Sequence, residues 1–304
     1  MASPRGFCAG VERAIRTVEE TLAAYGAPVY VRHKIVHTRH VVERLAAMGA
    51  IFIKEVEDAP DDRPLIISAH GAPAAISHNA HSRGIELIDA TCPLVHKVHA
   101  QIRRHIAQGR HVYLVGHAGH PEVIGTMGQV PSSAVTLVET IADVAALHER
   151  DGPKAYATQT TLSVDDAAIV IDALRARFPD IAAPTKQDIC YATTNRQDAV
   201  KASAKGTDLY LVFGSPESSN SVRLTETATR AGACKAELLE DSAAFDFEQI
   251  KGLHTIGISA GASAPESLVE EFLKNLATHC TLIIETVETV VEDIVFNTPS
   301  RLAS

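Results

Sequence analysis

Residues 112–122 read VYLVGHAGHPE, a short apolar run that ends in a cluster of polar side chains. Two other segments have the same form: VYVRHKIVH at 29–37 and LYLVFGSPESSN at 209–220. Short apolar runs bounded by turn residues are typical of buried strands. Each run is preceded by a segment of helical character that ends at or near a glycine, which commonly follows the last residue of a helix. The sequence therefore predicts the same helix and strand three times over.

A cysteine precedes each of these predicted helices in a nearly constant register. Cys8 lies 29 residues before His37, Cys92 lies 28 before His120, and Cys190 lies 29 before Ser219. A second polar segment follows in every repeat, where another apolar run ends; these segments are IISAHGAP at 66–73, YATQTTLS at 156–163 and GISAGASAPES at 257–267. The chain is thus interpreted as a threefold internal repeat.

Strands that alternate with helices at this spacing predict βαβ units and parallel sheets. We expect an α/β protein of three pseudo-repeated modules with small, mostly parallel sheets, arranged as a trefoil around a central cavity. The predicted modules are 1–91, 92–189 and 190–281, and a C-terminal tail, 282–304, is expected to pack back on the body. Ligands of open parallel sheets bind beyond the carboxyl ends of the strands, so the cysteines and polar segments are expected to face that cavity.

Composition excludes several classes of function. The 304 residues include 28 basic and 37 acidic side chains, for a net charge of −9, and no basic run that would neutralise nucleic-acid phosphates. No apolar stretch approaches the roughly 18 residues of a membrane span, and the first ten residues do not resemble an export signal. The sequence predicts a cytoplasmic protein that binds neither nucleic acid nor a membrane.

The cysteines are not expected to form a disulfide framework in a reducing compartment. Cys234 and Cys280 fall outside the repeat and are predicted to be small buried apolar residues. Cys8, Cys92 and Cys190 form a set only through the repeat, because no compact zinc-binding spacing joins them. Three thiolates on a four-iron cube would leave one iron open as a Lewis acid, which favours reductive chemistry at a C–O bond.

The candidate ligands in the polar segments are histidines, hydroxyls and an amide, with no arginine among them: His37, His70, His120, Thr160, Ser218, Ser219, Asn220 and Ser263. Together with helix N-termini, such groups suit a compact polyanion such as a diphosphate. Taken singly, such histidines are more often surface or core residues, and Ser-Ser-Asn is more often a turn or a helix cap. Glu122 is the candidate proton donor, and its alternative role is to cap the following helix.

At these residues the sequence resembles the 4-hydroxy-3-methylbut-2-enyl diphosphate reductase family (LytB/IspH), the last enzymes of the methylerythritol phosphate route to isoprenoids. The resemblance covers nearly the whole chain. It is carried by nine segments in family order: PRGFCAGVERAI, YVRHKIVHTRHVVERL, SAHGAP, DATCPLVHKVH, GHAGHPEVIGTMGQ, TQTTLSVDD, DICYATTNRQ, GSPESSNSVRL and AGASAPE.

The resemblance implies a three-lobed monomer around an oxygen-sensitive [4Fe-4S] cluster held by Cys8, Cys92 and Cys190. It implies a second set of residues that hold the diphosphate and its chain, namely His37, His70, His120, Ser218, Ser219, Asn220 and Ser263. Thr160 is similar to the threonine that positions the substrate hydroxyl, and Glu122 matches the catalytic acid. The implied reaction expels the C4 hydroxyl as water and yields isopentenyl and dimethylallyl diphosphates, with electrons from a ferredoxin or flavodoxin.

The sequence departs from the family pattern at Thr38, where an asparagine is common, and at Pro216 and Glu217, where a more basic or neutral pair is frequent. Only Met-Ala-Ser precedes Pro4, where the family usually has a strand of several residues. Two other functions are weighed beside the reductase. One is a non-catalytic iron–sulfur sensor or electron carrier; the other, ranked last because no compact histidine motif is present, is a zinc hydrolase.

Overall fold

The computed structural model describes residues 1–299, which form two compact units. Unit 1 comprises residues 1–11, 37–40 and 191–295. Unit 2 comprises residues 12–36, 41–190 and the described residues after 295.

Unit 2 contains a four-stranded parallel sheet in the order β3-β2-β4-β5. Its strands are β2 (Val29–Arg32), β3 (Ala50–Ile53), β4 (Leu65–Ile67) and β5 (Leu87–Asp89). The helices in this part of the chain are α1 (Ala9–Tyr25), α2 (Arg39–Ala47) and α3 (Ala74–Ser82). Because all four strands are parallel, their carboxyl ends lie at the same edge of the sheet.

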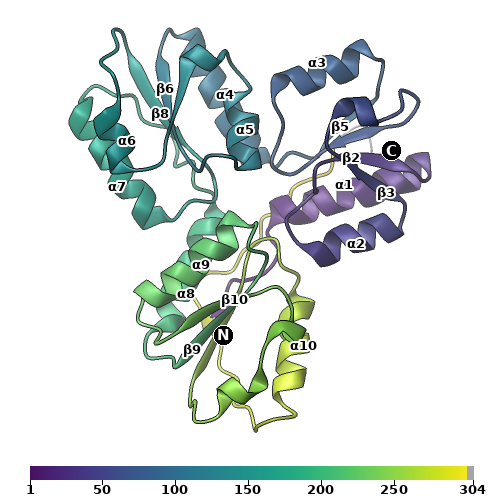
Figure 1. Cartoon of the computed structure of the whole chain (residues 1–304), viewed down its shortest axis with the longest axis vertical. Helices are drawn as coiled ribbons and strands as arrows, with labels where there is room; N and C mark the ends of the chain where they lie inside the picture. The colour runs from purple at the N-terminus through teal and green to yellow at the C-terminus, as the bar shows by residue number, and fades with distance from the viewer. Residues whose placement is uncertain (300–304) are drawn as a thin grey trace. The chain divides into compact units, whose positions relative to one another are not determined.

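The second sheet of unit 2 is parallel, in the order β7-β6-β8, with α4 and α5 beside one face and α6 and α7 beside the other (Figure 1). Its elements are α4 (Pro93–Ala107), β6 (His111–Val115), α5 (Pro121–Met127), β7 (Val135–Val138), α6 (Ile141–Ala146), β8 (Lys154–Thr158) and α7 (Val164–Arg177). Val112 and Leu114 pack with Ile102 of α4, whereas Tyr113 and Val115 pack with α7. Side chains alternate across a strand, so a central strand covered on both faces is apolar throughout.

Unit 1 repeats this design with a parallel sheet in the order β10-β9-β11. Its elements are α8 (Tyr191–Ala204), β9 (Leu209–Phe213), α9 (Ser219–Arg230), β10 (Ala236–Leu239), β11 (Ile256–Ala260) and α10 (Glu266–Leu276). Leu211 and Phe213 pack against Phe272 of α10, whereas Tyr210 and Val212 pack against the α8 and α9 side.

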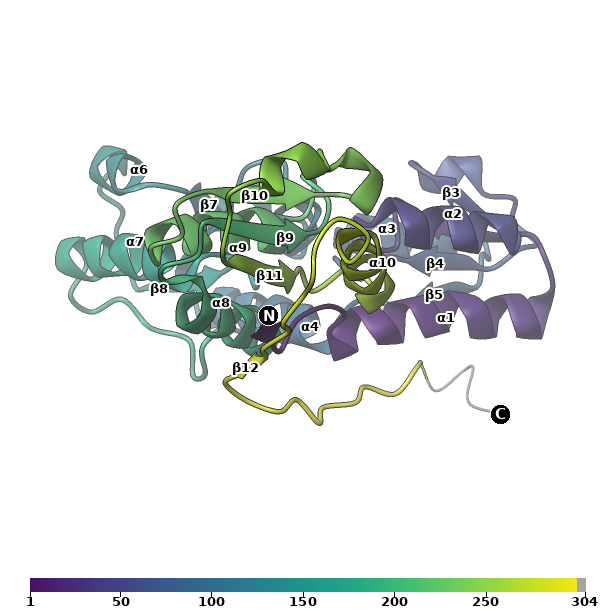
Figure 2. The ribbon, with the colours of Figure 1, turned by 90° about the horizontal axis from the view of Figure 1, so that it is seen from below.

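A short parallel pair joins the two ends of unit 1, β1 (Ala2–Ser3) and β12 (Val287–Glu288) (Figure 2). Extended chain without helix or strand follows β12 as far as the described residues go. The 3₁₀ helices are η1 (Val56–Asp58), η2 (Ser132–Ala134), η3 (Ser242–Ala244) and η4 (Phe247–Ile250). The last five residues of the predicted tail, 300–304, lie outside the described residues.

The predicted α/β class with small parallel sheets is confirmed, since every strand pair among residues 1–299 is parallel. Each of the three larger sheets lies within one of the predicted ranges 1–91, 92–189 and 190–281; those module bounds and the trefoil arrangement stay predictions. The predicted burial of Cys234 and Cys280 is wrong, because both are exposed. Cys234 lies in the turn between α9 and β10, and Cys280 just after α10, where the chain returns to solvent. No helix among the described residues is both long and apolar enough to cross a membrane.

Candidate active site

Each of the three repeat cysteines lies immediately before a helix. Cys8 precedes α1, Cys92 is the N-cap of α4, and Cys190 precedes α8. All three are partly exposed. The first turn of a helix has backbone N–H groups without intrahelical partners and the positive end of the helix dipole, so these positions favour an anionic ligand. Each of the three cysteines therefore lies in the same electrostatic environment, the positive end of a helix dipole.

The backbone N–H of each cysteine donates a hydrogen bond to a predicted polar segment. The donor and acceptor pairs are Cys8 N to Ala262 O at 3.1 Å, Cys92 N to Ala69 O at 3.0 Å and Cys190 N to Thr160 O at 3.0 Å. The three acceptors follow β11, β4 and β8, each at the carboxyl end of a parallel strand. In each unit, the cysteines thus lie beside the polar segments that the sequence predicted to surround a ligand.

Glu122 is the most deeply buried acid in the predicted site. It lies in the first turn of α5 and is 2% exposed. Its Oε1 accepts a hydrogen bond from the backbone N–H of Thr160 at 2.7 Å, and its Oε2 accepts one from the Thr160 hydroxyl at 2.8 Å. The neighbouring strands β6 and β8 pair Val115 with Thr158, which brings the segments that follow them together. Both of these hydrogen bonds come from Thr160 and not from the first turn of α5, so they do not support the helix-capping role.

Burial raises the pKa of Glu122 from 4.5 to about 7, because the carboxylate form loses its solvation. The two hydrogen bonds from Thr160 act in the opposite direction, and the negative charge of Asp188 adds a smaller upward contribution to this pKa. A carboxyl with a pKa near neutrality holds a proton that it can release at physiological pH. The environment thus suits Glu122 to general acid chemistry.

Two histidines of unit 2 accompany this carboxyl. His120 is the N-cap of α5, and its Nδ1 accepts a hydrogen bond from the Glu122 backbone N–H at 3.2 Å. The His70 ring lies edge-on to the His120 ring, with the centroids 6.0 Å apart. His70, His120, Glu122 and Thr160 therefore form one group of predicted site residues, which we call the acid cluster.

In unit 1, a second group of predicted residues gathers at the N-terminus of α9. Ser218 is the N-cap, and its Oγ accepts a hydrogen bond from the Ser221 N–H at 3.3 Å. The Ser263 hydroxyl donates to Ser218 Oγ at 3.5 Å, and Asn220 Oδ1 accepts from Ala262 N at 2.8 Å. We call Ser218, Ser219, Asn220 and Ser263 the hydroxyl cluster; Ser219 is the first residue of α9.

His37 and its neighbour Thr38 belong to the same unit as the hydroxyl cluster. The Thr38 hydroxyl donates to the Ser263 carbonyl, and His37 Nδ1 lies 4.0 Å from a Glu217 carboxylate oxygen. Thr38, which stands where the family commonly has an asparagine, thus connects the segment that carries His37 to the hydroxyl cluster.

Ser221 was not predicted, although it packs at the centre of this arrangement. It is fully buried, and a Cβ on either Gly214 or Gly261 would overlap its side chain. These two glycines directly follow β9 and β11. Their missing side chains let the first turn of α9 approach the carboxyl ends of both strands. The glycines of the GSPESSN and AGAS segments would have been a signal for this close approach.

Asp188 is a second buried acid that sequence reasoning missed. It is 3% exposed, and its carboxylate accepts hydrogen bonds from the Thr158 N–H at 3.2 Å and from Gln101 at 3.3 Å. Lys97 Nζ lies 3.2 Å from its other oxygen. Burial raises the pKa of Asp188, while Lys97 acts in the opposite direction. Asp188 lies two residues before Cys190, so its contacts with Thr158, Gln101 and Lys97 hold the segment that leads to this cysteine.

Among residues 1–299, no group of three or more histidine, cysteine, aspartate or glutamate side chains is placed to hold a single metal ion. The thiolate ligands of a four-iron cube differ from such a group, since each binds a different iron atom.

Most of this sequence matches a known protein family. A family model described as LytB protein matches residues 1–277. The chain belongs to the LytB family. Relatives named 4-hydroxy-3-methylbut-2-enyl diphosphate reductase include those of Phenylobacterium zucineum, 56% identical over 304 residues, and Hyphomonas neptunium, 55% identical over 304 residues. In both cases the match covers 100% of this chain and 96% of the relative.

Two solved structures resemble this chain. The E-1-hydroxy-2-methyl-but-2-enyl-4-diphosphate reductase of Plasmodium falciparum is 37% identical, with a TM-score of 0.95 over 99% of this chain and 95% of that chain. A structure titled (E)-4-hydroxy-3-methyl-but-2-enyl diphosphate reductase, the terminal enzyme of the non-mevalonate pathway, is 31% identical. Its TM-score is 0.65, over 92% of this chain and 98% of that chain. The LytB fold therefore extends over nearly the whole of this chain.

Proposed function

We propose that this LytB-family chain is a 4-hydroxy-3-methylbut-2-enyl diphosphate reductase, an oxidoreductase of the last step of the methylerythritol phosphate pathway. The substrate, (E)-4-hydroxy-3-methylbut-2-enyl diphosphate, takes up two electrons and two protons. Its C4–O bond breaks, the oxygen leaves as water, and a C–H bond forms to give isopentenyl or dimethylallyl diphosphate. The relatives named above support the activity, and the buried Glu122 carboxyl held by Thr160 is the observation that carries it for this chain.

Glu122 is proposed to supply the proton that converts the departing hydroxyl into water. Its pKa of about 7 leaves a substantial fraction of the carboxyl protonated at neutral pH. Thr160 contacts both carboxyl oxygens, so it fixes the direction in which the proton is delivered and is proposed to orient the substrate hydroxyl. The adjacent N-terminus of α5 and the rings of His70 and His120 would favour an anionic substrate.

The hydroxyl cluster is proposed to bind the diphosphate, together with His37, His70 and His120. Ser218, Ser219 and Asn220 lie at the first turn of α9, a helix of 12 residues. Helix N-terminal N–H groups and hydroxyl donors suit phosphate oxygens, and the cluster residues themselves carry no negative charge that would repel the anion.

Cys8, Cys92 and Cys190 are proposed to hold a [4Fe-4S] cluster. The donor set fits this group, because each thiol is partly exposed, precedes a helix and has its backbone N–H fixed to a neighbouring loop. When bound, such a cluster supplies single electrons and an open iron that acts as a Lewis acid. A transient ferredoxin or flavodoxin donor, a cytoplasmic location and a monomeric state complete the proposal.

The test begins with anaerobic purification and measurement of iron and acid-labile sulfide. We expect roughly four irons per chain and turnover of the allylic diphosphate with a strong reductant. A cluster whose EPR spectrum does not respond to the diphosphate would instead favour the sensor or carrier. One equivalent of zinc without labile sulfide would favour the hydrolase.

Substitution of a predicted ligand tests the cysteine set directly. Cys92→Ser should lose most of its iron and its turnover, whereas the matched Cys234→Ser, at an exposed cysteine outside the repeat, should keep both. Full iron content and activity in Cys92→Ser would refute the proposed ligand set.

A further inference from the structure

Three basic side chains occupy equivalent places in the repeat. Arg13 lies five residues after Cys8, Lys97 five residues after Cys92, and Arg196 six residues after Cys190. They belong to α1, α4 and α8, the helices that the cysteines precede. Each donates hydrogen bonds to backbone carbonyls just ahead of another repeat cysteine: Arg13 ahead of Cys92, Lys97 ahead of Cys190 and Arg196 ahead of Cys8. Arg196 also donates to the Ala192 carbonyl of its own helix at 3.0 Å.

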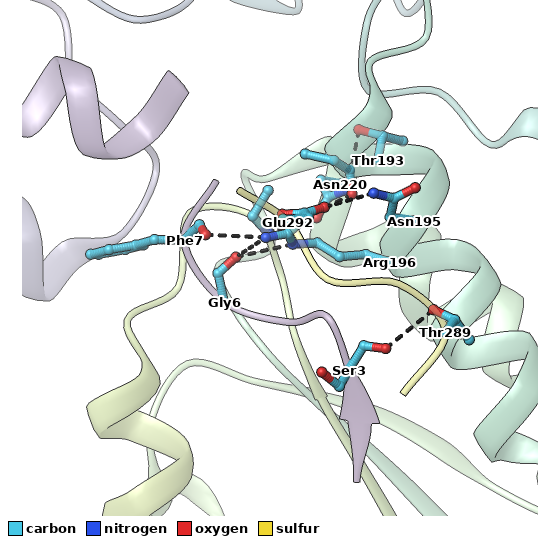
Figure 3. A network of polar contacts seen from close by, with 11 residues as sticks. Ser3, Gly6, Phe7, Thr193, Asn195, Arg196, Asn220, Thr289 and Glu292 are labelled. Atoms are coloured by element: carbon cyan, nitrogen blue, oxygen red, sulfur yellow. Dashed lines mark hydrogen bonds and ion pairs between the residues drawn. The ribbon is translucent and has the colours of Figure 1, made fainter. Parts of the chain in front are cut away.

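Arg196 shows the most extensive version of this contact (Figure 3). It is 1% exposed, and its Nε and Nη2 donate to the Gly6 carbonyl at 3.0 and 2.8 Å. Nη2 also donates to the Phe7 carbonyl at 3.1 Å, directly ahead of Cys8. Glu292 pairs with its Nη1 at 3.0 Å, so the buried charge is balanced.

Arg13 makes the corresponding contacts ahead of Cys92. Its Nη1 donates to the Thr91 carbonyl at 3.0 Å, and its Nη2 donates to the Asp89 carbonyl at 3.2 Å. Its Nε donates to the Asn297 carbonyl at 2.7 Å. Arg13 as a whole is 8% exposed, so its charge acts on these carbonyls with little solvent screening.

Lys97 makes the contacts ahead of Cys190. Its Nζ donates to the Lys186 carbonyl at 3.0 Å and to the Gln187 carbonyl at 2.6 Å. The same nitrogen pairs with Asp188, whose other oxygen holds the backbone of β8 through Thr158. The lysine therefore connects the cysteine segment to the sheet beside it.

We propose that Arg13, Lys97 and Arg196 are positioning residues that each fix the backbone leading to the next cysteine. The helix after one cysteine thereby orients the following one, and the contacts run in a cycle through all three. Ligands of a cofactor must be held to within a few tenths of an ångström, and such support comes from side chains that do not touch the cofactor. The inference rests on the proposed function for the role of the cysteines, but the contacts themselves are independent of it.

The cyclic order gives a test that general destabilisation would not pass. Hydrogen exchange is followed by mass spectrometry on the full-length, anaerobically purified chain. Lys97→Met should accelerate exchange of the backbone around 186–190 by roughly tenfold or more, because two charge-assisted hydrogen bonds are lost. Exchange after the variant's own cysteine, at 94–96, should change little. Lys97→Arg keeps a cation at this place and should restore protection.

Lys154→Met is the matched control, since Lys154 also donates to a backbone carbonyl, that of Gly152, away from the cysteines. It should leave exchange at 186–190 unchanged. Arg13→Gln and Arg196→Gln extend the pattern, with faster exchange at 89–92 and at 6–8 respectively. Uniform acceleration across the chain, or acceleration around the variant's own cysteine alone, would overturn the proposal.

Iron content and the EPR-monitored midpoint potential of the same samples connect the contacts to the cofactor. Lys97→Met should lose iron several-fold faster than the wild-type chain in air and show a shifted potential, with both restored in Lys97→Arg. Faster hydrogen exchange at 186–190 without any change in iron retention or midpoint potential would refute the link to the cofactor. If the wild-type chain bound no iron while the exchange pattern held, the proposed function would fail and the positioning contacts would stand.

Discussion

Of the acid cluster of unit 2 and the hydroxyl cluster of unit 1, only the first contains a buried titratable acid. Glu122 is 2% exposed with a pKa of about 7, whereas Ser218, Asn220 and Ser263 are buried and neutral. Burying a carboxyl is costly, and here the cost yields a proton available at neutral pH. Neutral hydroxyls and an amide at a helix N-terminus can bind an anion but cannot serve as a proton source at that pH. The comparison therefore supports the proposal that the acid cluster supplies the proton, whereas the hydroxyl cluster only binds the substrate.

The strongest test of this division is Glu122→Gln. Glutamine has nearly the same shape and can still accept from the Thr160 N–H while its amide donates to the Thr160 hydroxyl, so the fold should be kept. The variant lacks the acidic proton, and kcat should fall by roughly 10²- to 10⁴-fold. Steady-state kinetics with a strong reductant should show KM changed by no more than a few-fold.

The control for Glu122→Gln is substrate binding measured by diphosphate-induced changes in the EPR spectrum. Retained binding with lost turnover supports proton delivery by this residue. Wild-type turnover would move the acid role elsewhere, and lost binding would place Glu122 with the hydroxyl cluster as a binding residue.

The same substitution should change how stability depends on pH. A carboxyl whose pKa is raised on folding binds more protons in the folded state, so ionisation of Glu122 lowers the stability of the fold increasingly as pH rises from about 4.5 to about 7. The shift corresponds to roughly 3 kcal/mol. Urea unfolding between pH 5 and 8 should show that the free energy of unfolding of Glu122→Gln increases relative to that of the wild type as pH rises. A constant difference would mean that Glu122 titrates normally.

A smaller effect of a different kind is expected in the hydroxyl cluster. Ser263→Ala removes one donor near the N-terminus of α9 and leaves every titratable group in place. A hydrogen bond to a charged group contributes about 1.5–3 kcal/mol, so KM should rise by roughly 10- to 100-fold with kcat little changed. Ser203→Ala is the matched control, because Ser203 bonds within α8 and to Tyr210. A fall in kcat with KM unchanged would contradict the proposed binding role of the hydroxyl cluster.

The sequence was most informative where the repeat constrains both spacing and polarity. It predicted the helices after Cys8, Cys92 and Cys190 and the apolar strands that follow them, because a central parallel strand must be apolar on both faces. It also predicted the polar segments at the carboxyl ends of the strands. It did not show that Glu122 and Thr160, 38 residues apart, share two hydrogen bonds, since that contact depends on the pairing of β6 with β8.

The basic residues of α1, α4 and α8 were missed for a physical reason. Arginine and lysine on a helix are usually solvated, and a helical pattern alone does not show whether a guanidinium reaches backbone carbonyls. Arg196 is nevertheless 1% exposed, and its carbonyl partner Gly6 is 190 residues away in the chain. Their regular place after each cysteine is visible in the sequence, but their carbonyl partners lie in distant segments that the spacing alone does not indicate.

Thr160→Val gives the finest test of the acid cluster, because it alters the environment of Glu122 without removing the carboxyl. The Thr160 hydroxyl stabilises the ionised form of Glu122, so its loss should raise the pKa of this acid further. Turnover that needs protonated Glu122 declines as pH rises through its pKa, so the alkaline limb of the pH–kcat profile should move to higher pH. Thr160→Ser keeps the hydroxyl and should hold the limb near its wild-type position, even if the overall rate falls. An alkaline limb that stays in place in Thr160→Val would show that a group other than Glu122 sets it.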